Sequence, residues 1–209
     1  MSPSKELPDY TVGSDGLRRC WWCGDDPQYI EYHDREWGKP AADDQQLYEK
    51  MCLEGFQAGL SWITILRKRS AFRSAFRDFK IESVAKFSSS RVEKMLLDAK
   101  IVRHRGKIES AINNAQRALE LRDEFGSLAH FFWQFEPAKP KYLDHRKEMT
   151  AHRPESTALS KELKRRGWSF VGPTTCYSLM QAMGMVNDHL RECHRWKVIE
   201  QLRSEFTRP

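Results

Sequence analysis

The chain has 209 residues, of which 40% are hydrophobic, 31% charged and 11% aromatic. This composition excludes a disordered protein, and the length suits one compact unit. The formal net charge of +6 favours an anionic partner such as nucleic acid, although a solvated basic surface would give the same charge. Apolar runs are too short for a membrane span and residues 1–19 lack a secretion signal, so we expect a cytoplasmic protein without membrane contact.

Residues 1–18 are rich in Ser, Pro, Gly and Asp and predict a flexible tail. Beyond them, apolar residues recur at helical spacing. An Asp-Pro pair predicts the start of a short helix over residues 28–36. Asp43 or Asp44 caps a second helix, and Ser61 caps a third.

Further along, short helices are expected at 81–87 and 91–98, followed by a long helix that Gly126 ends. Residues 136–156 contain three prolines and many charges and predict a loop, after which helices resume at Thr157. No alternation typical of strands persists along the chain. We therefore predict an all-α fold, with residues 19–209 forming a single unit of two helical lobes, and we expect a monomer.

The five cysteines are odd in number, which argues against a disulfide framework and favours burial or metal binding. A tetrahedral zinc site needs four ligands, and two at each end of the chain could supply them. These are Cys20, His33, His189 and Cys193. The last two are four residues apart and would share one face of a helix. Cys23 could replace Cys20 or His33, His194 could replace His189, and each residue could instead be buried without a metal.

An acidic residue lies within the apolar stretch MCLEGFQAGLSW, and several aromatic residues precede or follow it. A desolvated Glu54 would need a cationic or donor-rich partner. Aromatic faces beside a carboxylate suit a planar ligand that carries positive charge. The aromatic residues are Trp22, Tyr29, Tyr32, Trp37 and Trp62. The alternative is that these rings belong to an ordinary helical core and that Glu54 faces solvent.

The segment GWSFVGPTTCYSLMQAMG predicts a glycine-bearing turn between two helices. Backbone N–H groups at the start of the second helix, near Gly172, Pro173 and Thr174, could hold a DNA phosphate without reading the base sequence. An ordinary helical hairpin would have the same pattern.

Several of these segments, in this order, resemble those of 3-methyladenine DNA glycosylase I, a bacterial family of alkylation-repair enzymes. They are YHDREWG, CLEGFQAGLSWITIL, IVRHRGKI, LKRRGWSFVGPTTCYSLMQA and VNDH. The resemblance runs from about Cys20 to Cys193. It implies a helix-hairpin-helix DNA glycosylase fold with a zinc-binding module that joins the N- and C-terminal segments.

The resemblance also assigns roles to residues. It implies one structural Zn²⁺ held by Cys20, His33, His189 and Cys193, and it gives Cys23 no role. It implies that Glu54 is the acid that recognises the damaged base. Tyr32 and Trp62 would pack against the two faces of that base. Trp22, Tyr29 and Trp37 would form the wall of the cavity. Phe56 stands where we expect glutamine, and Asp188 lies near the place of the usual catalytic aspartate but is not expected to be catalytic.

The activity implied is that of a DNA-3-methyladenine glycosylase acting on double-stranded alkylated DNA. The enzyme would flip out 3-methyladenine, excise it by hydrolysis and leave an abasic site, with free 3-methyladenine as the product. No pocket lysine is indicated for Schiff-base chemistry, so we expect a monofunctional enzyme. We expect phosphate contacts at the turn around Gly172 and a wedge at Gly59 and Leu60. Arg103, Arg105 and Lys107 would add positive charge without necessarily lying close to the turn. Two alternatives are a DNA-binding relative without activity and a hydrolase with a catalytic zinc.

Overall fold

Helix α2 (Asp44–Gln57) lies at the centre of the computed structural model, which describes residues 8–209. It packs against α3, α6, α7 and α9, and most of its residues are buried. The other helices are α1 (Pro27–Arg35), α3 (Trp62–Ala75), α4 (Ile81–Val84), α5 (Ser89–Leu97), α6 (Arg105–Phe125), α7 (Leu128–Trp133), α8 (Pro154–Arg165), α9 (Pro173–Ala182) and α10 (Trp196–Glu205). Single 3₁₀ turns are η1 (Trp21–Cys23), η2 (Arg77–Phe79) and η3 (Arg146–Glu148).

The helix starts predicted from capping residues are confirmed. The Asp26 side chain accepts hydrogen bonds from the backbone N–H groups of Gln28 and Tyr29, and Asp43 rather than Asp44 caps α2. Ser61 is the N-cap residue of α3, and Gly126 follows the last residue of α6 with a φ of 83°. Side-chain oxygens satisfy N–H groups that a helix start leaves without partners, which explains why these positions could be located in the sequence.

The prediction of an all-helical chain is wrong in one place. Strands β1 (Tyr10–Val12) and β2 (Arg18–Cys20) pair antiparallel within the segment predicted as a flexible tail. The buried guanidinium of Arg19 holds this hairpin by bonding to Asp15 in its turn and to Asp34 on α1. Three-residue strands are too short to show alternation, so the sequence carried no signal for them. Residues 1–7 of the predicted tail lie outside the described residues.

The helix predicted to carry His189 and Cys193 is also wrong. The chain between α9 and α10 is irregular, and Leu190 forms a parallel β-bridge with Leu143. The backbone N–H of Arg191 donates to the Leu143 carbonyl, which draws this segment out of helical geometry. Residues 136–156 form the expected loop apart from η3, but α8 begins at Pro154, earlier than predicted.

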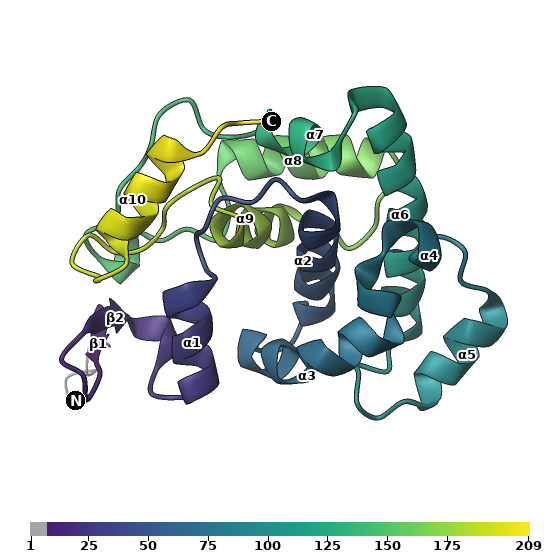
Figure 1. The fold of residues 1–209 in the computed structure, drawn as a ribbon, viewed down its shortest axis with the longest axis horizontal. Coiled ribbons are helices and arrows are strands. Elements are labelled where there is room, and N and C mark those ends of the chain that lie inside the picture. The colour runs from purple at the N-terminus through teal and green to yellow at the C-terminus, as the bar shows by residue number, and fades with distance from the viewer. Residues whose placement is uncertain (1–7) are drawn as a thin grey trace, which may run out of the picture.

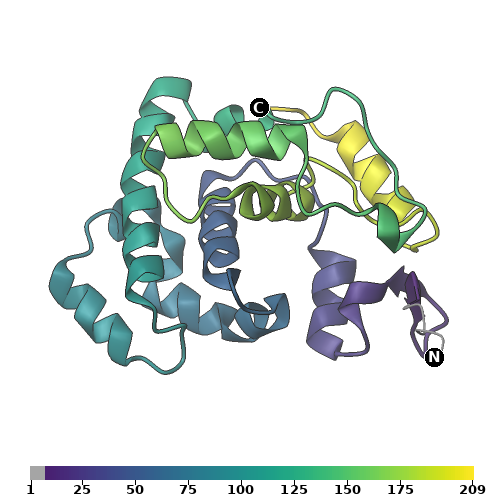
Figure 2. The ribbon, with the colours of Figure 1, turned by 180° about the vertical axis from the view of Figure 1, so that it is seen from behind.

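The segment just before α10 lies against the N-terminal hairpin, so parts of the chain that are far apart in the sequence meet. Figures 1 and 2 both place α10 next to the N-terminal hairpin and α1. The backbone N–H of His194 donates to the Arg18 carbonyl at 3.0 Å, and Arg18 forms an ion pair with Glu192. Aromatic rings fill the core on the far side of α2, where Phe56 contacts Phe72 with centroids 4.5 Å apart. No helix within residues 8–209 is both long and apolar enough to cross a membrane.

Gly184 closes the turn after α9 against the segment that leads into α2. Its φ is +72°, and a Cβ there would lie 2.4 Å from the Pro40 nitrogen and 2.7 Å from the Gly38 carbonyl oxygen. Both clashes are with backbone, which cannot rotate away. Gly126 has a similar φ of +83°, but a Cβ there would have no other atom within 4 Å.

We predict that Gly126→Ala lowers the free energy of unfolding by about 1–2 kcal/mol, the cost of left-handed backbone. Gly184→Ala should cost about 1–3 kcal/mol more, because it adds a steric clash. Equilibrium unfolding in urea measures both values. Equal losses in the two variants would contradict the close approach at Gly184.

Candidate functional site

A cavity of about 180 Å³, here called the front cavity, opens between α1, α2, α3 and α9. Glu54 and all five aromatic residues expected from the sequence line it. The structure adds Gln57 and residues from the loop and α9. The full lining is Trp21, Trp22, Tyr29, Tyr32, Trp37, Glu54, Gln57, Trp62, Met149, Ser178 and Gln181. The sequence-based grouping of one acid with these rings is therefore confirmed as a spatial cluster.

Tyr32 and Trp62 form the inner wall of the front cavity. Tyr32 lies on α1 and Trp62 is the first residue of α3, and their ring centroids are 5.3 Å apart at an interplanar angle of 45°. Both side chains are buried. Burial raises the pKa of Tyr32 well above its usual value, so its hydroxyl remains protonated and able to donate a hydrogen bond.

Trp22 and Trp37 meet edge to face, with centroids 4.8 Å apart. Trp22 also contacts Tyr29 at 5.1 Å, and Trp37 contacts the His189 ring at 4.5 Å. Offset and edge-on contacts of this kind stabilise aromatic clusters and fix the ring planes. The wall of the front cavity is therefore rigid and continuous with the residues expected to bind metal.

Glu54 is buried, with only 5% of its side chain exposed, and its charge partner comes from its own helix. Lys50, one turn earlier on α2, places Nζ 2.9 Å from Oε1 of Glu54 and donates a hydrogen bond to the Tyr32 hydroxyl at 2.6 Å. The sequence analysis did not anticipate a lysine beside Glu54, although Lys50 does not itself line the front cavity. Burial lowers the pKa of Lys50, while Glu54 opposes that shift. The spacing of four residues was visible in the sequence, but it is usual for exposed ion pairs.

Other lining residues were missed by the sequence analysis. Ser178 and Gln181 are polar residues three apart on the largely buried helix α9, a pattern that could have marked them as cavity residues. Phe56 does not line the front cavity, because it packs into the phenylalanine cluster with Phe72 and Phe76. The difference from the expected glutamine therefore leaves the cavity wall unchanged.

Asp188 is fully buried and its carboxylate is saturated with donors. Arg153 and Gln181 each donate to it at 2.8 Å, and the Tyr177 hydroxyl bonds to it as well. A buried ion pair with these additional donors is well compensated but has no oxygen free for a reaction. This geometry agrees with the expectation that Asp188 is not catalytic.

The ligand atoms of Cys20, His33 and Cys193 lie within 4.8 Å of one another. All three residues are buried. His189, the fourth expected ligand, is fully buried beside them, with its ring centroid 5.0 Å from that of His33. Its Nε2 atom has no hydrogen-bond partner among the described residues. An orphaned imidazole nitrogen at a cluster of two thiols and a second imidazole is the donor set that zinc prefers.

Hydrogen bonds to residues outside the ligand cluster orient both histidine rings. Nδ1 of His33 lies 2.7 Å from Oδ1 of Asp34, and Nδ1 of His189 lies 3.1 Å from Oδ1 of Asn187. These oxygens accept the Nδ1 protons, which leaves a lone pair on each Nε2. A hydrogen bond from the Cys20 thiol lowers the pKa of Cys193 to about 4, while burial raises that of Cys20. Burial also lowers the pKa of His189, which keeps it neutral.

The alternative ligands lie elsewhere. The Cys23 thiol donates to the Cys20 carbonyl at 3.3 Å, and burial raises its pKa to about 11. His194 places Nε2 2.9 Å from Asp34. Asp34 thus contacts both His33 and His194, and this trio forms a second, more exposed group of ligand types.

The turn between α8 and α9 has the predicted form, with Gly172 as the N-cap of α9 and Pro173 at its first position. Thr174 follows in the first turn. Phe170, in the same turn, has a left-handed φ of 55° and approaches α2, where a Cβ at Gly55 would lie 3.4 Å from it. The turn therefore lies close to the C-terminal end of α2.

Gly59 and Leu60 form the turn between α2 and α3, shortly after the cavity residue Gln57. Gly59 has a φ of +80°, and Leu60 is 42% exposed, a large apolar side chain presented to solvent. Lys107 stabilises this turn. Its ammonium group donates hydrogen bonds to the carbonyl oxygens of Phe56 at 2.9 Å and Ala58 at 2.5 Å. A buried cation at the C-terminus of a helix satisfies carbonyls that lack partners.

The three basic residues expected near the phosphate turn differ in their surroundings. Lys107 is buried and committed to α2. Arg105 is exposed and forms ion pairs with Glu93 at 2.8 Å and Glu109 at 3.4 Å. Lys107 and Arg105 therefore already have partners within the protein, and Arg103 is exposed.

A sequence model of the family described as Methyladenine glycosylase matches residues 22–196. Because this covers most of the chain, the protein belongs to the methyladenine glycosylase family. The match begins after Cys20 and ends within the first turn of α10, so the β-hairpin and most of the C-terminal helix lie outside it.

Individual relatives agree with this assignment. The chain is 46% identical over 179 residues to DNA-3-methyladenine glycosylase 1 of Escherichia coli, covering 85% of this chain and 96% of that protein. The crystal structure of a 3-methyladenine DNA glycosylase I superposes with a TM-score of 0.81 at 46% identity, covering 84% of this chain and 98% of the other. A tyrosine-to-phenylalanine variant of 3-methyladenine DNA glycosylase I, solved in complex with 3-methyladenine, has a TM-score of 0.79 at 37% identity and covers 82% of this chain and 93% of its own.

We predict that Lys107→Met lowers the free energy of unfolding by about 1–3 kcal/mol, since it leaves two carbonyls at the end of α2 without a charged donor. Lys94→Met, which removes an exposed lysine from α5, serves as the control and should be nearly neutral. Chemical denaturation of both variants tests this. If the two losses are the same, Lys107 does not support the turn.

Proposed function

We propose that the protein is a DNA-3-methyladenine glycosylase, which removes 3-methyladenine from alkylated double-stranded DNA and leaves an abasic site. The observation that carries this proposal is the buried carboxylate of Glu54 in a cavity walled by Tyr32, Trp62 and other aromatic rings. The names of the relatives support it, as does the solved complex of one of them with 3-methyladenine.

Methylation of N3 gives adenine a positive charge and weakens its glycosidic bond. Such a base is released without a strong general acid, because it departs as a neutral molecule. In this proposal Glu54 accepts a hydrogen bond from the exocyclic amine, and the aromatic faces stack on the cationic ring. Water then attacks the sugar as the bond to the base breaks. Selectivity against normal adenine follows from the charge of the base.

The lesion must first leave the DNA stack, which costs a few kcal/mol and is easier for a damaged pair. We assign the grip on DNA to a helix-hairpin-helix element made of α8, the turn and α9. Its backbone N–H groups around Gly172, Pro173 and Thr174 would bind phosphate, as helix N-termini do. The exposed Leu60 beside Gly59 would fill the gap left by the flipped base.

The position of Lys50 also supports excision by water without a covalent intermediate on the enzyme. A Schiff base with the sugar needs a neutral amine that reaches the reacting carbon. Lys50 is instead an ion-pair partner of Glu54 and lies outside the set of residues that line the front cavity. The proposed enzyme is therefore monofunctional. Chromosomal DNA as substrate suits a cytoplasmic enzyme, and a cavity built by one chain suits a monomer.

Glu54→Gln keeps the size of the side chain and removes its charge. We predict that it lowers release of 3-methyladenine from alkylated DNA by at least about 100-fold, because the cationic base loses its counter-charge. Chromatography of released free base measures this, and the wild-type product should contain abasic sites without strand breaks. The exposed Glu31→Gln on α1 serves as the control. Unchanged release by the Glu54 variant would refute the assigned role.

We further propose that Cys20, His33, His189 and Cys193 bind one structural Zn²⁺. The donor set of two thiols and two neutral imidazoles fits the ion, as do the orphaned Nε2 of His189 and the outer partners Asp34 and Asn187. When bound, the ion would join β2 and α1 to the segment before α10. Four protein ligands leave no position for a reacting water, so its role is to hold the two ends of the chain together.

Cys193→Ser should lose most of its zinc and unfold at a lower temperature than the wild type, since structural zinc contributes directly to folding. Cys23→Ser removes a buried thiol from the same region but no proposed ligand, and it should retain one zinc per chain. Elemental analysis and thermal denaturation, each with and without chelator, report both effects. Full zinc content in the Cys193 variant would contradict this ligand set.

A further inference from the structure

Lys50 occupies an unusual position for a lysine. Its side chain is 7% exposed, yet its ammonium group has three partners. It lies 2.9 Å from Glu54 Oε1, donates to the Tyr32 hydroxyl, and lies over the Trp62 ring with Nζ 3.4 Å from the centroid. A carboxylate and two aromatic side chains are the same groups that the proposed function assigns to a cationic base. Lys50 thus places a positive charge beside the groups that we propose recognise the base.

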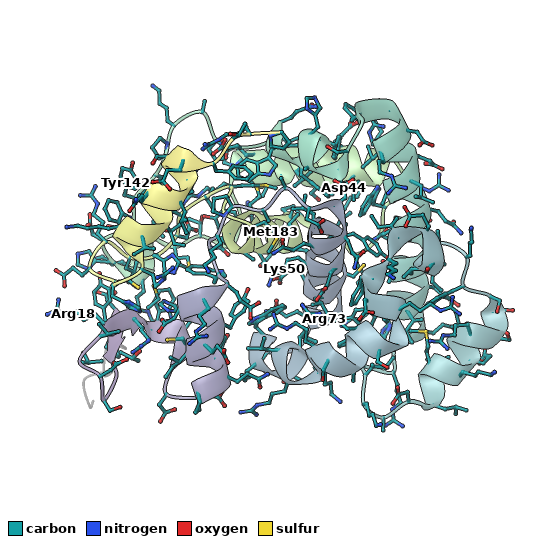
Figure 3. The ribbon with its side chains drawn as sticks, in the orientation of Figure 1. Arg18, Asp44, Lys50, Arg73, Tyr142 and Met183 are labelled. Atoms are coloured by element: carbon teal, nitrogen blue, oxygen red, sulfur yellow. The ribbon has the colours of Figure 1, made fainter. Side chains whose placement is uncertain are left out.

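Lys50 reaches these groups from the side opposite the front cavity. A second cavity of about 160 Å³, the rear cavity, lies behind Tyr32 and Trp62, which line both cavities. Glu54 lines only the front cavity, whereas Lys50 lines only the rear one. Figure 3 places Lys50 at the centre of the molecule, between Met183 and Arg73, which also line the rear cavity. The ammonium therefore bonds Oε1 of Glu54 from the side of the rear cavity, while Glu54 itself lines the front cavity.

Four of the charged groups around Lys50 form two ion pairs, while Arg35 and Lys39 also line the rear cavity. On α3, Arg69 bonds to Glu36 after α1 at 2.7 Å, and Arg73 bonds to Glu49 of α2 at 2.8 Å. Lys50 is the cation bonded to Glu54 in the described part of the chain. A carboxylate buried without a counter-charge takes up a proton, because its charged form is poorly solvated. Lys50 therefore supplies the counter-charge that this buried carboxylate needs before a base enters.

We propose that Lys50 is a positioning residue for recognition of the damaged base. It supplies the counter-charge of Glu54 in the free enzyme and, by bonding one carboxylate oxygen, directs the other into the front cavity. It also occupies an acceptor position of the Tyr32 hydroxyl, so the hydroxyl proton is available as a donor to another group. This inference rests on the proposed function and deepens it, since it explains how a buried acid is ready for a cationic ligand.

The test compares the pH dependence of 3-methyladenine release in Lys50→Met, Lys50→Gln and Lys50→Arg. Without the ammonium, the charged form of the buried Glu54 side chain loses its counter-charge and is disfavoured. The acid limb of kcat/KM for the Met and Gln variants should therefore move to higher pH, far enough that activity at pH 7 falls about 10-fold and recovers as the pH rises further. The Arg variant should keep the wild-type limb. Lys197→Met, on exposed α10, controls for loss of one surface charge.

A purely structural role would reduce activity equally at every pH, and that result would overturn the proposal. The Gln variant keeps a hydrogen-bond donor and guards against loss of folding in the Met variant, with circular dichroism as the check. In a Glu54→Gln background, Lys50→Met should add little further loss, because Lys50 acts through Glu54; an additive loss would also overturn it. Failure of the wild-type enzyme to release 3-methyladenine would instead contradict the proposed function itself.

Discussion

The arrangement of this protein depends on keeping one negative charge inside an apolar, ring-lined cavity. A buried carboxylate is costly unless it is paired, and α2 supplies the pair from within one helical turn. Tyr32 and Trp62 line the cavities on both sides of this ion pair. The helices packed around α2 serve to hold these few atoms away from water and in fixed orientation.

The metal-ligand cluster and the cavity form one continuous structure. His33 follows Tyr32 directly on α1, so one residue faces the cavity and its neighbour faces the thiols. Trp37 packs edge to face on His189 and on Trp22. The aromatic wall therefore packs against the same residues that we propose bind zinc. Direct ring contacts thus connect the cluster to the cavity wall.

Local signals in the sequence located most helices, since Asp26, Asp43 and Gly126 act through short-range hydrogen bonds and backbone conformation. The acid and its aromatic neighbours were also recognisable, because one carboxylate in an apolar helix is unusual. The features that the sequence did not predict depend on contacts between residues far apart in the chain. Arg19 organises a hairpin through Asp34, and Leu143 pulls the chain around His189 out of a helix. Lys50 was missed because a spacing of four residues indicates a pair but not its burial.

The packing of the N-terminal hairpin and α1 against the segment before α10 has a consequence for synthesis of the protein. Cys20, His33 and the cavity tryptophan Trp37 are made well before His189 and Cys193. The N-terminal hairpin, α1 and the tryptophan wall therefore lack these partners until the later segment has been made. Competence to hold a base should arise only after that point, which would keep shorter nascent chains from engaging DNA.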